Sequence, residues 1–112
     1  MPAHTTLAEL QARAYHDSQH WFPDVHADDR TAAVHFSLGI AGEVGELVNI
    51  VKKANRSGRW NGYVHDHHAD LRHEAADVAI YLLDLCAALN IDLAYAIDEK
   101  RAILVERWGD PD

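Results

Sequence analysis

Apolar residues recur every three or four positions along two long segments of the chain. From about Thr31 to Lys53 the predicted core stripe is Ala33, Phe36, Ile40, Val44, Leu47 and Val51. From about Ala69 to Ala88 the same spacing recurs in Leu71, Ala75, Val78, Leu82, Leu85 and Leu89. This spacing matches one face of an α-helix, so each segment is predicted to form a long helix with one buried face.

Capping signals add a helix on either side of these two. Thr6 and Glu9 have the spacing of a capping box, and the helix that they open is expected to end near Trp21. Asp92 is suited to cap a last helix that runs to about Trp108. The chain therefore contains four predicted helices.

Helical periodicity stops at three places, residues 21–30, 54–66 and 90–92. Asn90 can end the third helix, because Asn tolerates the left-handed conformation found at helix C-termini. No convincing strand remains between these breaks. The 112 residues are therefore predicted to form one all-α domain, a four-helix bundle over residues 1–112.

Composition narrows the range of partners and compartments. The net charge is −8 and the Lys and Arg residues are scattered, which argues against a nucleic-acid partner. The single cysteine, Cys86, lies in an apolar run and is expected to be a buried, inert thiol in a reducing compartment. The start, MPAHTTLAEL, lacks the features of a signal peptide, and no apolar stretch approaches the roughly 20 residues that span a bilayer. We expect a soluble, cytoplasmic protein without a membrane partner.

Two pairs of carboxylates interrupt the apolar stripes. Glu43 and Glu46 lie one turn apart in the sequence GEVGEL, and Glu74 and Asp77 repeat this spacing on the next long helix. Both pairs adjoin a core stripe, so all four carboxylates are expected to line a boundary between packed helices. Such a cluster is tolerable only if some carboxylates are protonated or a cation lies between them, and oxygen ligands favour Mg²⁺ or Mn²⁺.

A solvated helix face is the simpler interpretation of a single ExxE pair. The second pair argues against it, and so do Gly42 and Gly45, since Gly costs about 1 kcal/mol in a helix interior. A close approach by another helix or a ligand would explain these glycines. Asp84 lies two turns from Asp77, about 10 Å along the axis, and is expected to be solvated or interfacial.

The order ExxE, 27 intervening residues and ExxD resembles the MazG-like nucleotide pyrophosphohydrolases. These belong to the all-α NTP pyrophosphatase superfamily, with the dCTP pyrophosphatases and dimeric dUTPases. The matching segments are GEVGELVNIVKK and HEAADVAIYLLDL, followed by the basic stretch EKRAILVERW. The similarity covers about Trp21 to Trp108.

The resemblance implies Mg²⁺-dependent hydrolysis of a nucleoside triphosphate to the monophosphate and pyrophosphate. The substrate would be an NTP or dNTP, and the reaction would serve nucleotide-pool sanitation or its regulation. Glu43, Glu46, Glu74 and Asp77 become metal ligands, and one of them would orient or deprotonate the attacking water. The family also implies a homodimer or homotetramer with sites near subunit boundaries.

Basic residues after the carboxylates match positions that contact phosphates in this family. Lys100 and Arg107 occupy the downstream positions, but the Asn that the family commonly has between them is Leu104 here. Lys53 belongs to a second basic group, at residues 52–56, that could compensate. The alternative is that these side chains are solvated or complement a helix dipole.

Aromatic residues suggest a place for the nucleobase. Trp21 and His26 resemble a Trp and a His that precede the second helix in dCTP pyrophosphatases, and Tyr81 matches another aromatic position there. Stacking on a ring with a polar edge contact would hold a base. Ordinary core packing is the alternative for Trp21 and Tyr81. A later Trp of those enzymes corresponds to Lys53, so dCTP specificity is not transferred.

Three other interpretations stay open. Four histidines fall in or beside a segment expected to be an exposed polar loop, where a Zn²⁺ or Ni²⁺ site lacks a diagnostic spacing: His65, His67, His68 and His73. A di-iron carboxylate bundle would need Glu-x-x-His pairs, and only Asp70 and His73 approach this pattern. A catalytically degenerate metal-binding or protein-interaction module is the non-enzymatic alternative, to which Leu104 would point.

Overall fold

The computed structural model describes residues 5–112, and every regular element within them is helical. The elements are α1 (Leu7–Trp21), the 3-10 helix η1 (Pro23–His26), α2 (Asp29–Arg56), α3 (Trp60–Asp66), α4 (His68–Ala88) and α5 (Leu93–Trp108). The predicted all-α class is therefore confirmed for this part of the chain. Residues 1–4 lie outside the described part of the chain. They belong to the predicted domain and to the N-terminal segment that was expected not to be a signal peptide.

The predicted caps form the expected hydrogen bonds. The Glu9 backbone N–H donates to the Thr6 hydroxyl oxygen at 3.1 Å, and the Glu9 carboxylate accepts from the Thr6 N–H at 3.3 Å. Asp92 accepts from the backbone N–H of Tyr95 at 3.2 Å. These short-range contacts fix where α1 and α5 begin, which is why sequence reasoning could find them.

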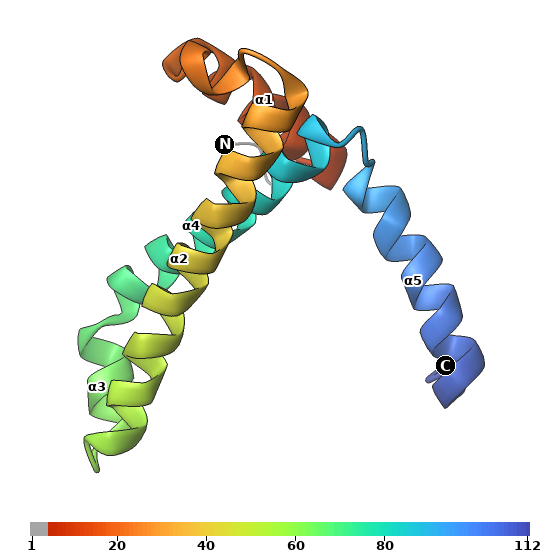
Figure 1. Cartoon of the computed structure of the whole chain (residues 1–112). Coiled ribbons are helices and arrows are strands. Elements are labelled where there is room, and N and C mark those ends of the chain that lie inside the picture. Colours follow the sequence, from red (N-terminus) through yellow and green to blue (C-terminus); the bar gives the residue numbers. More distant parts are fainter. Residues whose placement is uncertain (1–4) are drawn as a thin grey trace.

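Helices α2 and α4 lie side by side over most of their length, while α1 and η1 cover one end of the pair and α3 lies at the other (Figure 1). A small core forms at the covered end around Ala32, Phe36 and Ala88. Tyr15 of α1 and Tyr81 of α4 pack against it. The core is thus confined to one part of the helix pair.

The face of α2 that meets α4 differs in part from the predicted stripe. Phe36 is buried and Leu47 is half-buried as expected, but Val44 and Val51 remain 39% and 42% exposed. A helix turns by about 100° per residue, so Val44 lies well round the helix from the half-buried Glu43. The stripe prediction was wrong at both valines, because Glu43 takes the inward position.

The segment predicted as a long break, residues 54–66, is largely helical. Helix α2 continues to Arg56, and the Ser57 hydroxyl donates to the Ala54 carbonyl at 2.7 Å while accepting from the Arg59 N–H at 3.1 Å. After this turn α3 begins at Trp60. The prediction failed because it relied on the spacing of apolar residues, whereas local polar contacts form the corner between α2 and α3.

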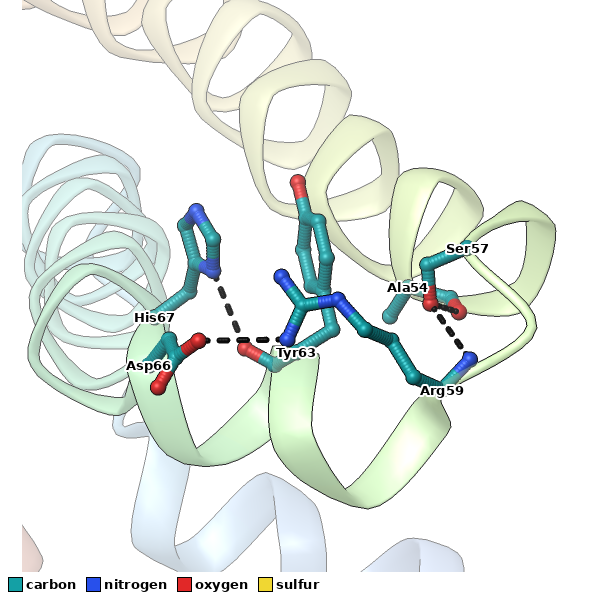
Figure 2. A network of polar contacts seen from close by, with 6 residues as sticks. All are labelled: Ala54, Ser57, Arg59, Tyr63, Asp66 and His67. Carbon is teal, nitrogen blue, oxygen red and sulfur yellow. Dashed lines mark hydrogen bonds and ion pairs between the residues drawn. The ribbon is translucent and has the colours of Figure 1, made fainter.

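Figure 2 shows the contacts that hold α3 against the start of α4. Arg59 pairs with Asp66 at 3.2 Å, and its guanidinium lies 5.8 Å from the centre of the Tyr63 ring. The His67 ring stacks on Tyr63 with ring centres 4.0 Å apart, and its Nδ1–H donates to the Tyr63 carbonyl at 2.9 Å. Three of the four clustered histidines lie on helices: His65 on α3, and His68 and His73 on α4. His67 is the single residue between these two helices, so the expected polar loop is replaced by a tight turn.

The turn after α4 directs α5 away from α2 and α4. Asn90 adopts the predicted left-handed conformation, with φ 57°, and the Ile91 N–H donates to the Cys86 carbonyl at 2.7 Å. The Gln11 side chain, from α1, then donates to the Ile91 carbonyl at 2.7 Å and accepts from the Leu93 N–H at 3.1 Å. Helix α5 leaves α4 at 98° and stands apart from α2, as Figure 1 shows. No residue of α5 is buried.

Helix α2 is also long and apolar enough, by length and composition, to cross a membrane. The joined pair of α4 and α5 would qualify only as a span bent by 98°. This differs from our expectation because we considered only uninterrupted apolar stretches. Helix α2 is apolar on average, although it contains charged residues such as Glu43 and Glu46. Core helices of soluble proteins have the same properties, so this result assigns no location.

Asp84 is buried, at 3% exposure, and not solvated. Its Oδ1 atom has no hydrogen-bond partner among the described residues. Burial, with a smaller contribution from Asp17 on α1, raises the pKa of its carboxyl from 3.8 to about 7. The carboxyl also raises the pKa of Tyr15, behind the larger effects of burial and of Asp29. Helix α1 packs over α4 and shields Asp84 from water, which the spacing along α4 alone could not predict.

Asp84→Asn should make stability less dependent on pH. The folded state keeps the Asp84 proton up to about pH 7 and the unfolded state only up to about 3.8, so the free energy of unfolding falls as pH rises between these values. At pH 8 the Asn variant should be more stable than the wild type by roughly 2 to 4 kcal/mol. This gain should shrink toward pH 4 in urea unfolding. An exposed control, Asp98→Asn, should show no such trend, and an equal gain at both pH values would contradict the assignment.

Candidate metal centre

Three of the four predicted carboxylates converge between α2 and α4. One oxygen from each of Glu43, Glu46 and Glu74 lies within 4.8 Å of the other two. Glu43 and Glu46 share one side of α2 because they are one turn apart, and the side-by-side packing of α4 brings Glu74 against them. Glu43 and Glu74 are half-buried, whereas Glu46 is exposed at the edge.

Burial and mutual repulsion disfavour ionisation of all three carboxylates at once. The pKa of Glu74 is raised from 4.5 to about 7, first by hydrogen bonding of its protonated form to Glu43, then by burial and by Glu46. When both groups are ionised, Glu43 Oε2 and Glu74 Oε2 are buried without a hydrogen-bond partner among the described residues. A proton shared among the three groups reduces their repulsion, and a divalent cation would do so more completely. The residues therefore fit a hard metal ion held by oxygen atoms.

Asp77, the fourth predicted ligand, does not belong to this convergent group. It lies half-buried on α4, one turn after Glu74. One turn further, the Tyr81 ring closely approaches Gly39, where an added Cβ would lie 3.0 Å from the ring. This close approach occurs at Gly39 rather than at Gly42 or Gly45, the two glycines for which a neighbour was expected.

A row of aromatic rings leads from Tyr81 toward η1. The Tyr81 ring centre is 6.2 Å from that of Phe36, Phe36 is 5.6 Å from His26, and His26 is 5.0 Å from Tyr15. The His26 Nε2 atom lies 2.8 Å from the Ser18 hydroxyl oxygen, at hydrogen-bonding distance. Tyr81 and His26, both predicted to contact a base, thus contribute to core packing in the single chain.

The pKa of His26 is lowered by burial and, to a smaller extent, by the nearby His35. Both effects favour the neutral form of the His26 imidazole. Its Nδ1 atom is buried and has no partner among the described residues. Ser18, which is 4% exposed, was not identified from the sequence, because its contact with His26 depends on how the chain turns through η1.

The remaining predicted substrate contacts are dispersed. Trp21 is 65% exposed at the end of α1, and Lys53 is exposed near the end of α2. Lys100 and Arg107 lie on α5, which stands apart from α2, the helix that carries Glu43 and Glu46 (Figure 1). The structure therefore brings together the three glutamates but not the basic residues of the last helix.

A shallow, open depression lies beside Glu46 and was not predicted from the sequence. Its lining residues are Gly42, Gly45, Glu46, Val48, Asn49 and Lys52. Asn49 and Lys52 follow Glu46 at intervals of three residues, so their helical spacing was the available signal. The clustered histidines, by contrast, join no group of three metal-binding side chains in residues 5–112.

Comparison of the chain with protein-family models, with curated proteins and with solved structures found no match. The convergence of the three glutamates is therefore the structural feature that bears most directly on function.

Proposed function

We propose that this protein is a Mg²⁺-dependent nucleoside triphosphate pyrophosphohydrolase that acts on an NTP or dNTP in nucleotide-pool sanitation or regulation. The observation that carries the proposal is the convergence of Glu43, Glu46 and Glu74, with two buried carboxylate oxygens that have no partner among the described residues. The order and spacing of the acidic motifs support a MazG-like enzyme. The predicted cytoplasmic location belongs to this proposal.

The chain's own residues would act mainly by binding and positioning. Glu43, Glu46 and Glu74 would hold Mg²⁺, or Mn²⁺ in its place, and Asp77, one turn after Glu74 on α4, would join them only after a side-chain rearrangement. Bound there, the ion would offset the triphosphate charge and stabilise the charge that develops on the leaving pyrophosphate. A ligand carboxylate would orient the attacking water or accept its proton.

The phosphates also need cationic side chains. Lys52 lies beside Glu46 at the shallow depression, and Lys53 is its neighbour. Lys100 and Arg107 would reach the site only from another subunit or after α5 moves. The proposal therefore includes a homodimer or homotetramer in which neighbouring subunits complete the MazG-like four-helix bundle, supported by the absence of buried residues on α5.

A helical metal-binding or interaction module without turnover is the second candidate. Two observations favour it: Lys100 and Arg107 are separated from the carboxylates within one chain, and Leu104 stands where the family commonly has Asn. This candidate shares the metal site with the enzyme, so only measurement of products separates the two.

The full-length protein with Mg²⁺ should convert at least one NTP or dNTP to the monophosphate and pyrophosphate. Glu46→Gln keeps the size of the side chain but removes one ligand charge, and should lower the turnover rate by at least about a hundredfold. Glu106→Gln on α5 makes the same chemical change outside the cluster and serves as the matched control. Chromatography of the nucleotides, with a separate assay for pyrophosphate, would measure both products.

Release of orthophosphate in place of pyrophosphate would contradict cleavage between the α and β phosphates. Binding of Mg²⁺ without turnover of any nucleotide would favour the non-enzymatic module. Equal turnover by Glu46→Gln and the wild type would refute the assignment of the catalytic site.

Metal binding should displace protons below about pH 7. Glu74 has a pKa of about 7 without a cation, and a bound cation favours its ionised form. The apparent Mg²⁺ affinity should thus rise by about tenfold from pH 6 to pH 8 and level off above pH 8. Calorimetric titration in buffers of different ionisation enthalpy would measure both affinity and proton release. A pH-independent affinity over this range would show that Glu74 is not a ligand.

A further inference from the structure

The shallow depression adjoins the metal centre, because Glu46 belongs to both. Its volume is about 370 Å³, which is within the range of sites for small molecules. Asn49 and Lys52 follow Glu46 at intervals of three residues, so Lys52 lies about 9 Å from Glu46 along the helix axis. Each interval also turns the side chain further from the side of α2 that meets α4. A ligand that begins at the metal centre would therefore extend along the solvent side of α2.

Two glycines line this depression. Gly42 and Gly45 both have open space where a Cβ would be, with no atom within 4 Å. Packing within the chain therefore does not explain them, although glycine weakens a helix. Bare backbone at these positions allows a flat ligand to lie directly against α2. Val48 supplies an apolar side chain beside it.

The polar side chains of the depression beyond Glu46 are unused within the described chain. Asn49 and Lys52 are exposed and have no hydrogen-bond or ion-pair partner in residues 5–112. The Asn49 amide can donate or accept, depending on its orientation, whereas the Lys52 ammonium can only donate. A ligand group beside Lys52 must therefore be an acceptor.

The aromatic residues that were expected to hold a base are engaged elsewhere or lie apart. Tyr81 and His26 both pack with Phe36 in the single chain. Trp21 lies exposed at the end of α1 and does not line the depression. The depression, by contrast, shares a residue with the metal centre and has room for a planar ring.

We propose, as an extension of the proposed function, that this depression holds the nucleobase of the substrate and that Lys52 selects bases with a carbonyl in place of an exocyclic amine. The order of groups along α2 matches their order in a nucleotide. The triphosphate lies at Glu46, the sugar and the near edge of the base lie at Asn49, and the far edge of the base reaches Lys52.

The far edge of the base differs between two chemical classes. Uracil, thymine, guanine and hypoxanthine carry a carbonyl there, whereas cytosine and adenine carry an amine. The Lys52 ammonium donates to the carbonyl, but two donors face each other when the base carries an amine. Asn49 can turn its amide to suit either class, so Lys52 is the residue that discriminates.

This placement gives the two adjacent lysines different roles. Lys53 follows Glu46 by seven residues, close to two full turns, so both residues lie on nearly the same side of α2. Lys52 lies about 100° further round the helix, toward the solvent side. Lys53 is therefore placed for the phosphates and Lys52 for the base.

Lys52→Gln tests the discrimination directly. With Mg²⁺, the wild type should show a kcat/KM for dUTP about tenfold above that for dCTP, and the same preference for dITP over dATP. In Lys52→Gln both ratios should fall close to one, because a Gln amide can either donate or accept. Each ratio compares two substrates of one variant, so a uniform loss of activity cancels. Arg101→Gln, which removes one positive charge from an exposed position on α5, should leave both ratios unchanged.

Gly45→Ala separates the depression from the metal centre. The added Cβ meets nothing within 4 Å in the chain and favours helix, so the variant should unfold at a higher urea concentration. The same methyl group occupies the space of the base and should raise the KM for dUTP severalfold. Inhibition by inorganic tripolyphosphate with Mg²⁺ should stay unchanged, because this anion has no base.

Direct binding tests the contact without turnover. A dUTP analogue with an imido group between the α and β phosphates resists cleavage at that linkage. With Mg²⁺ it should shift the amide resonances of Gly42 and Gly45 more than the ring resonances of Tyr81 and His26. The corresponding dCTP analogue should bind about tenfold more weakly.

Failure of this inference and failure of the proposed function give different results. Turnover with base ratios that Lys52→Gln leaves unchanged would overturn the base contact alone. A uniform loss for all four nucleotides in Lys52→Gln, with weaker inhibition by tripolyphosphate, would assign Lys52 to the phosphates and also overturn it. Analogue shifts confined to Tyr81 and His26 would place the base elsewhere. Binding of neither analogue would overturn the proposed function together with this inference.

Discussion

The contact between α2 and α4 is the constraint on which the rest of the structure depends. At one end it buries Phe36 among apolar neighbours, and two turns further along α2 it presses Glu43 against Glu74. The same packing that stabilises the pair therefore forces carboxylates together and raises the pKa of one of them. Apolar burial at the covered end offsets this repulsion in the absence of a cation. A metal ion would turn the unfavourable half of the contact into a stabilising one.

Much of this arrangement could be predicted from the sequence because it rests on local geometry. The Thr6 capping box, the Asp92 cap and the left-handed Asn90 each involve residues that are close in sequence. Helical spacing likewise predicts that Glu43 and Glu46 share one side of α2. Their approach to Glu74 needed one further assumption, that the two long apolar segments pack together, and the structure supports it.

Features that depend on distant parts of the chain could not be predicted in this way. The direction of α5 is set by Gln11, whose side chain binds the turn about 80 residues later in the sequence. Asp84 is buried because α1 crosses α4, although its spacing along α4 allowed a solvated position. The spacing of Val44 along α2 is that of a core residue. Because Glu43 takes the inward position, however, Val44 lies on an exposed side of the helix. Periodicity identifies a helix better than it identifies the face that another helix will cover.

Helix α2 carries different features on its two sides, the carboxylate cluster toward α4 and the shallow depression on the solvent side. Its inner side supplies Glu43 to the carboxylate cluster, whereas Gly45, only two residues away in sequence, lies on the opposite side of the helix. Glu46 lies at the boundary, since it belongs to the cluster and also lines the depression on the outer side. Any molecule that covered this depression would exclude water from Glu46 and thereby strengthen its attraction to a bound cation. Binding at the depression and metal binding in the cluster would then favour each other through this one side chain.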